Sequence, residues 1–248
     1  MHWKEYDHKS GGENGKDPSG VSTPHGFMPR WGNMGDDSSG ECGVPTSQRF
    51  QMPRSTDSNG VFWYSYDYAT THTTVISSEH DLSRGSPQHT WLVQDLESVN
   101  RTETPWLVVE VHRPFYNAEM DWDDYAVGVG MRMEMEHLLR DYQVDIVFAG
   151  HYHSYFRSCD GLFRSVCNNN GPIHITVGTA GASLESVPFY KTSWSSKNII
   201  RTFGYGRVTV MNSTALHFEF VKAGSQDDPD SGKSLDHIWI TRNRLNQF

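Results

Sequence analysis

The apolar residues of this chain gather into short uninterrupted runs, and the most informative run spans residues 146–149. Its sequence, Ile-Val-Phe-Ala, has no polar alternation, which is typical of a strand buried on both faces in a parallel sheet covered by helices. Gly150 ends the run, and His151 and His153 follow it. Because ligands collect at the carboxyl ends of such strands, we expect both imidazoles at a functional edge of the sheet.

A second apolar run precedes this one and also ends in a histidine. Residues 106–112 read as a buried strand that delivers His112 at its carboxyl end. The segment 125–142 between the two strands has apolar residues at helical spacing, namely Met131, Met135, Leu138 and Leu139. A strand, a helix and a second strand form a right-handed crossover, in which both carboxyl ends lie at one edge of the sheet. We therefore expect His112 to approach His151 and His153.

Three imidazoles at one edge predict a metal site. Neutral imidazole is a common ligand for Zn, Fe, Mn and Ni. The alternative for each histidine is a hydrogen bond to a backbone carbonyl, because a His-x-His motif alone is weakly specific.

The remaining pattern predicts an α/β domain over residues 61–248. Strands are expected over 61–68, 72–78, 173–178, 206–211, 215–221 and 234–241, and a helix is expected to begin at Pro87 after a Ser86 cap. Residues 1–60, in contrast, are rich in Gly, Ser, Asp, Asn and Pro. Because this opening also holds several aromatic residues, we expect an irregular segment that packs on the domain rather than a solvated linker.

The amino-acid composition and net charge of the chain disfavour some classes of binding partner. The chain has 248 residues, 36% of them hydrophobic, and a formal net charge of −9. Nucleic acid is an unfavourable partner, because its binding rests on clusters of Lys and Arg. An anionic small substrate would need a local positive charge, most simply a metal ion. No apolar run approaches the roughly 20 residues that cross a bilayer, and no signal peptide is visible, so we expect no membrane association.

Cysteines and glycosylation sequons favour a secreted or lumenal protein. Cys159 and Cys167 flank a short loop that a disulfide could close, which would leave Cys42 unpaired. Asn100 and Asn212 begin Asn-x-Thr sequons and are candidate glycosylation sites. The alternative is a cytosolic protein with three reduced thiols.

Several of these stretches, in this order and spacing, resemble the second half of the purple acid phosphatases, a family within the calcineurin-like metallophosphoesterases. The resemblance rests on residues 111–116, 150–155 and 174–181, and further on 40–45, 63–68, 78–80 and 203–208. It implies the C-terminal half of a four-layer αββα sandwich that is incomplete at its N-terminal side.

The resemblance also implies an activity, the hydrolysis of phosphate monoesters at acidic pH by a dinuclear centre of Fe with Zn, Mn or Fe. His112 and His151 match ligands of the divalent metal, and His153 matches a ligand of the ferric ion. Arg113 is a candidate phosphate contact, although it could instead pair with the acidic loop 119–124. No residue is identified as the catalytic group.

The chain departs from the family at its other ligand motifs. It contains neither an Asp-x-Asp strand end nor a Gly-Asp-x-x-Tyr segment, and Trp3 and Lys4 occupy the places of the Asn and His of a Gly-Asn-His-Glu motif. Two hypotheses follow. The chain is an acid phosphatase, or it is a catalytically impaired remnant that binds at most one metal or acts as a partner half-domain through its exposed truncated sheet. A carbohydrate-binding or structural β module would leave the histidines unexplained.

Overall fold

The computed structural model describes residues 49–53, 58–120, 122–186 and 188–242. The expectations for the irregular opening, for the departures at Trp3 and Lys4 and for Cys42 lie outside these ranges.

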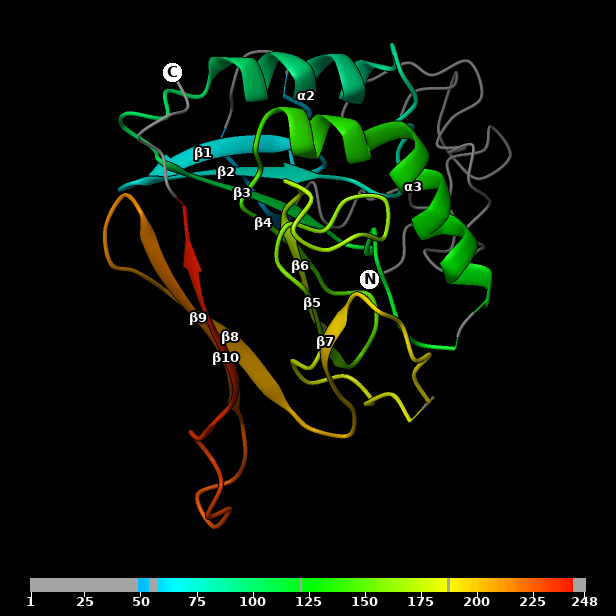
Figure 1. Cartoon of the computed structure of the whole chain (residues 1–248), viewed down its shortest axis with the longest axis vertical. Coiled ribbons are helices and arrows are strands. Elements are labelled where there is room, and N and C mark those ends of the chain that lie inside the picture. The colour runs from blue at the N-terminus through cyan, green and yellow to red at the C-terminus, as the bar shows by residue number, and fades with distance from the viewer. Residues whose placement is uncertain (1–48, 54–57, 121, 187, 243–248) are drawn as a thin grey trace.

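A seven-stranded mixed sheet forms the centre of the described structure (Figure 1). Its strands, in spatial order, are β1 (Tyr64–Tyr68), β2 (Thr71–Ile76), β3 (Trp106–Val111), β4 (Ile146–Ala149), β6 (Ile173–Val177), β5 (Tyr155–Ser158) and β7 (Ser195–Ile199). The inner neighbours β2, β3, β4 and β6 run parallel, and β1, β5 and β7 are antiparallel to their partners. The carboxyl ends of β3 and β4 therefore share an edge, as predicted.

The predicted strands are present, with small changes at their ends. The strand predicted for 61–68 begins at Tyr64, because Asn59 exchanges backbone hydrogen bonds with Phe62 and Trp63 and so closes a turn there. Strands β5 and β7 were not predicted from the sequence. Their residues, Tyr-Phe-Arg-Ser and Ser-Ser-Lys-Asn-Ile, lack a long apolar run.

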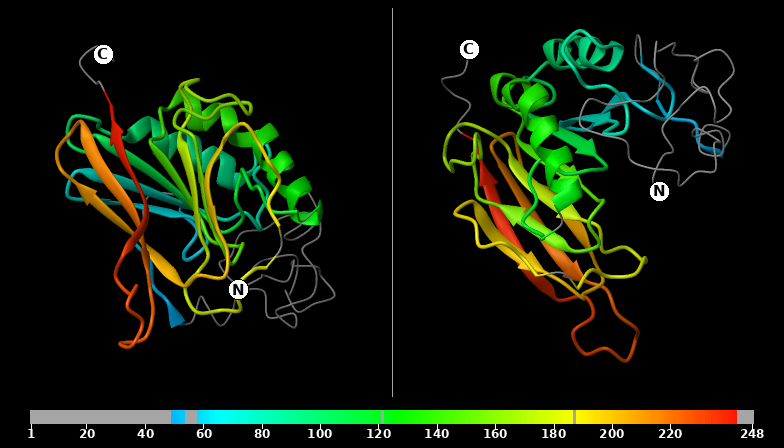
Figure 2. Two further views of the ribbon diagram at one scale, coloured as in Figure 1. Left: turned by 60° about the horizontal axis from the view of Figure 1, so that its bottom comes forward. Right: turned by 90° about the vertical axis from the view of Figure 1, so that its right-hand side faces the viewer.

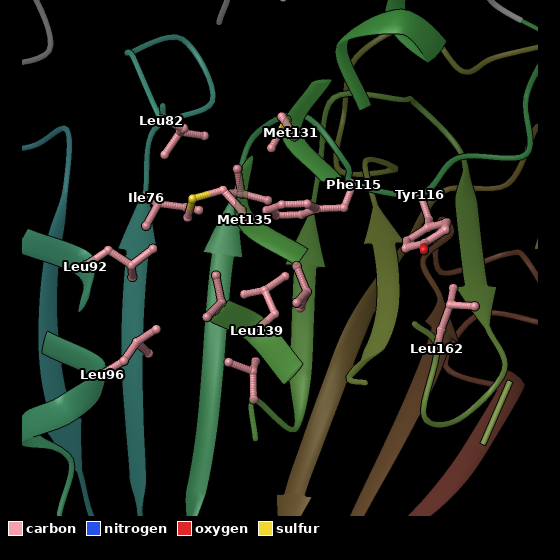
Figure 3. Packing of buried hydrophobic residues seen from close by; sticks show 14 of the residues in the cluster. Ile76, Leu82, Leu92, Leu96, Phe115, Tyr116, Met131, Met135, Leu139 and Leu162 are labelled. Atoms are coloured by element: carbon pink, nitrogen blue, oxygen red, sulfur yellow. The ribbon is translucent and has the colours of Figure 1, made fainter. Parts of the chain in front are cut away.

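Helices α2 (Pro87–Ser98) and α3 (Trp122–Asp141) cover one face of this sheet (Figure 2). The hydroxyl of Ser86 accepts a hydrogen bond from the backbone N–H of His89, which confirms the expected cap before Pro87. Figure 3 shows Met131, Met135 and Leu139 of α3 packed into the core beside the sheet. All three side chains are fully buried.

A three-stranded antiparallel sheet packs against the other face of the seven-stranded sheet (Figure 2). It contains β8 (Gly204–Val210), β9 (Ala215–Lys222) and β10 (Ser234–Thr241), in the order β10-β9-β8. Aromatic rings dominate the contact, and Phe220 of β9 stacks on Tyr155 of β5 with ring centroids 4.2 Å apart. The described residues thus form three of the four layers expected for the αββα sandwich.

One edge of the three-stranded sheet is open in the described structure. β8 lies at the end of the sheet and pairs with β9 on one side. Its residues Tyr205 and Val208 are exposed, and Arg207 pairs across the strands with Glu219. No described helix is both long and apolar enough to cross a membrane.

A disulfide joins Cys159 and Cys167, whose Cα atoms are 5.8 Å apart. It closes the loop that connects β5 to β6.

A cluster of polar side chains links α2 to strands β1 and β2 at the edge of the sheet through hydrogen bonds. Asp95 of α2 accepts hydrogen bonds from the hydroxyls of Ser65 and Thr74 and contacts Nε2 of His72 at 3.2 Å. Nδ1 of His72 lies 2.6 Å from the carboxylate of Asp67. Burial lowers the pKa of His72, but the two carboxylates outweigh burial and raise it above its usual value.

We predict that this cluster makes stability depend on pH. A histidine whose pKa is raised on folding stabilises the protein fully below its unfolded pKa of about 6.5, and this contribution is lost as pH rises through the folded pKa. The stability advantage of the wild type over His72→Gln should therefore be largest below about pH 6.5 and shrink as pH rises through the raised pKa of His72. Urea unfolding of both chains measures it, and an advantage that is constant or grows with pH would contradict this prediction.

Candidate metal and phosphate site

The carboxyl ends of three adjacent parallel strands bring the candidate residues together. Glu79 follows β2, His112 and Arg113 follow β3, and His151 follows β4. The backbone N–H groups of Gly150 and His151 donate to the carbonyl oxygen of His112 at 3.1 and 2.9 Å. The pairing of β3 and β4 therefore continues into the loops that carry the two histidines.

The imidazoles of His112 and His151 meet edge to face. Nε2 of His112 lies 3.1 Å from Nδ1 of His151, and the ring centroids are 4.9 Å apart. Two nitrogen ligands at about 2.0–2.1 Å from a tetrahedral zinc ion would lie roughly 3.3 Å apart. The separation of these two nitrogens therefore fits two ligands of one metal ion.

His153 does not join this pair. Its Nδ1 lies 2.7 Å from the backbone carbonyl oxygen of Ser183. A carbonyl only accepts, so Nδ1 carries the proton and Nε2 carries the lone pair, which is the orientation usual for metal-binding histidines. Among the described residues, no three His, Cys, Asp or Glu side chains form a group that could hold a metal ion. The structure thus corrects the expectation that all three imidazoles converge.

Arg113 is held in a buried ion pair. Its Nε lies 2.9 and 3.1 Å from the two carboxylate oxygens of Glu79, and both side chains are almost fully buried. The backbone N–H of Arg113 donates to the hydroxyl of Ser78 at 3.1 Å. Nη1 of Arg113 lies 3.2 Å from Nε2 of His151. The guanidinium therefore links the end of β2 to the histidine pair.

Glu79 is a site residue that was not predicted from the sequence. The available signal was its position, directly after a predicted parallel strand and next to the strand that delivers His112. The sequence could not show that its carboxylate turns toward Arg113.

Gly178 lets the loop carrying His151 lie against the end of β6. A Cβ atom at this position would lie 1.8 Å from the carbonyl oxygen of Tyr152 and 2.0 Å from that of Gly150. The N–H of Gly178 also donates to the carbonyl oxygen of Ser154 at 3.1 Å. The backbone of the loop that carries His151 therefore packs directly against the backbone at Gly178, with no side chain between them.

Two other histidines, His174 and His80, are packed in the interior. His174 is 3% exposed and lies against the rings of Phe115 and Tyr116. Burial, together with the charge of Arg132, lowers the pKa of His174 to about 3. Nδ1 of His80 contacts the hydroxyl of Ser77 at 2.7 Å, and burial lowers its pKa well below the usual value. These two histidines stay neutral and belong to the core.

Comparison with known proteins gives the class of this chain. It belongs to the calcineurin-like phosphoesterases, whose family model matches residues 26–155. Residues 171–237 match the model described as iron/zinc purple acid phosphatase-like protein C, so within this class the chain is of purple acid phosphatase type and corresponds to the C-terminal half.

Relatives agree with this placement. "Probable inactive purple acid phosphatase 27" of Arabidopsis thaliana is 35% identical over 79% of this chain and 34% of its own length. "Purple acid phosphatase 1" of Ipomoea batatas is 33% identical over 80% of this chain and 45% of its own length. The structure of purple acid phosphatase PPD1 from yellow lupin matches with a TM-score of 0.73 and 30% identity, over 94% of this chain and 40% of that chain. The chain therefore spans less than half the length of these relatives.

We predict that Gly178→Ala disrupts the site, because the added methyl would overlap two carbonyl oxygens of the His151 loop. Such overpacking typically costs about 1–3 kcal/mol, which urea unfolding can measure. Gly150→Ala is the matched control, because a Cβ there has no atom within 4 Å. Equal stability of the two variants would show that the close approach at Gly178 does not constrain the loop.

Proposed function

We propose that this protein is an acid phosphatase-type metallophosphoesterase that hydrolyses phosphate monoesters at the edge formed by His112, His151 and Arg113. The observation that carries the proposal is the 3.1 Å separation of Nε2 of His112 and Nδ1 of His151, which suits two ligands of one metal ion. Membership of the calcineurin-like phosphoesterases supports the same chemistry.

His112 and His151 would hold the divalent metal, and Nε2 of His153 would face the ferric ion of a dinuclear centre of Fe with Zn, Mn or Fe. Such a centre polarises the phosphate oxygens and activates a water molecule. One relative is named "Fe(3+)-Zn(2+) purple acid phosphatase 12", in support of this metal pair.

Arg113 would bind a phosphate oxygen. A guanidinium offers several N–H donors in one plane, which suits a tetrahedral oxyanion. Glu79 holds this guanidinium beside His151. The N–H donors of Arg113 would therefore lie next to the metal ligands when the substrate binds.

The second candidate function is a catalytically impaired protein that binds at most one metal or serves as a partner half-domain. Two observations favour it: some relatives are named "probable inactive" purple acid phosphatases, and the described residues hold no group of three metal ligands. Loss of a two-metal clamp would cost on the order of 10³-fold in rate.

In that second role, the protein would bind a second polypeptide through its exposed sheet. This partner would be equivalent to the N-terminal half of the family domain. Tyr66 and Tyr68 of β1 and Val208 of β8 are exposed apolar residues that such a partner could cover. The chain covers 34% and 45% of the length of two of its relatives.

The exposed sequons and the disulfide support a secreted or lumenal location. Asn100 and Asn212 both lie on the surface, where a glycan can be attached. The bond between Cys159 and Cys167 suits an oxidising compartment.

We predict that His151→Ala, His153→Ala abolishes metal binding and turnover. Metal content and p-nitrophenyl phosphate hydrolysis at about pH 5 should be measured for the wild type and for this double variant. His217→Ala, His237→Ala is the matched control, since those two rings lie 5.6 Å apart in the three-stranded sheet. Two bound metals with turnover in the wild type would support the phosphatase, whereas one metal or none without turnover would support the impaired protein.

A further inference from the structure

We propose that Arg113, held in place by Glu79, opposes metal binding at His151 by fixing which nitrogen of that ring carries the proton. The inference rests on the proposed function, because it concerns the histidine pair assigned there to the divalent metal. It gives Glu79 the role of a positioning residue that acts through Arg113.

The direction of the hydrogen bonds follows from the chemistry of arginine. A guanidinium only donates, so Nε2 of His151, 3.2 Å from Nη1 of Arg113, must accept. A neutral imidazole has one N–H and one acceptor nitrogen, which places the proton of His151 on Nδ1. Nδ1 then donates to Nε2 of His112 at 3.1 Å. The two hydrogen bonds therefore run in the same direction, from Arg113 to His151 and from His151 to His112.

This arrangement puts a proton where a metal ion would bind. The nitrogen of His151 that faces His112 is Nδ1, and a metal ligand needs a lone pair at that atom. The ring can offer it and remain neutral only if the proton moves to Nε2. Nη1 of Arg113 would then face an N–H group instead of an acceptor, so the hydrogen bond between Arg113 and His151 must be given up.

Glu79 makes that exchange costly. Nε of Arg113 is shared between both oxygens of Glu79, and the exposed fractions of the two side chains are 6% and 2%. A guanidinium that turned away would break this buried ion pair, which is strongly unfavourable. Arg113 is therefore kept beside His151, and the metal must compete with it.

Replacing both members of the ion pair tests the inference without changing the net charge of the site. Glu79→Gln, Arg113→Met removes one negative and one positive charge and deletes the donor to His151. Zinc binding to the full chain should be measured by isothermal titration calorimetry. We expect the dissociation constant of the double variant to fall by about tenfold, since a hydrogen bond to a charged group no longer has to be broken.

A second measurement reports the position of the proton itself. Long-range ¹H–¹⁵N correlation spectra of the histidine rings distinguish a proton on Nδ1 from one on Nε2. Before zinc is added, the wild type should show the proton of His151 on Nδ1, and the double variant should show a larger share on Nε2. A merely structural role of the ion pair would not move this signal.

The control is another buried pair, formed by Arg157 of β5 and Asp236 of β10, whose Nε and Oδ2 atoms lie 2.6 Å apart. Arg157→Met, Asp236→Asn removes the same charges and should leave both the zinc dissociation constant and the His151 spectrum unchanged. A similar tightening in this control would show that general loosening of the fold, and not Arg113, explains the effect.

The inference is overturned if His151 of the wild type carries its proton on Nε2, or if the Glu79 and Arg113 double variant binds zinc no more tightly than the wild type. If neither chain binds zinc, the proposed metal site fails, and the spectrum of wild-type His151 alone decides the inference. The same spectrum decides it if the double variant does not fold.

Discussion

The structure depends on the parallel hydrogen-bonded ladder that joins β2, β3 and β4. Parallel pairing sends three chain segments out of the sheet at one edge, so residues far apart in sequence, Glu79, Arg113 and His151, come within hydrogen-bonding distance. Two backbone bonds to the carbonyl of His112 extend this ladder by one more step. The side chains at the edge are thus positioned by the main chain, before any ligand contributes.

At this edge of the sheet, metal binding and hydrogen bonding to Arg113 compete for the imidazole of His151. The imidazoles of His112 and His151 suit a cation, and the guanidinium of Arg113 suits an anion. Because the positive charge of Arg113 is compensated by buried Glu79, the site tolerates a fixed cation beside potential metal ligands. The occupancy of this edge is therefore governed by hydrogen-bond direction as much as by charge.

Much of the fold could be predicted because its signals are local. Uninterrupted apolar runs mark β3 and β4, and the spacing of Met131, Met135 and Leu139 marks α3. The strands β5 and β7 were not predicted, because their segments of four and five residues contain no long apolar run. For the site, the residues that follow the strands could be predicted from the sequence, but the directions of their side chains could not. That is why His153 was expected beside His112, whereas its ring turns to Ser183.

Among the described residues, β8 pairs with a strand on one side only, and this affects how the chain can associate with other polypeptides. If two copies joined through antiparallel pairing of their β8 strands centred on Arg207, the two guanidinium groups would face each other, and like charges directly opposite are unfavourable. A foreign strand with an acidic residue at that register would meet no such repulsion. In this register Arg207, although it is paired with Glu219 of its own chain, disfavours strand pairing between identical chains, whereas pairing with a different polypeptide is left open.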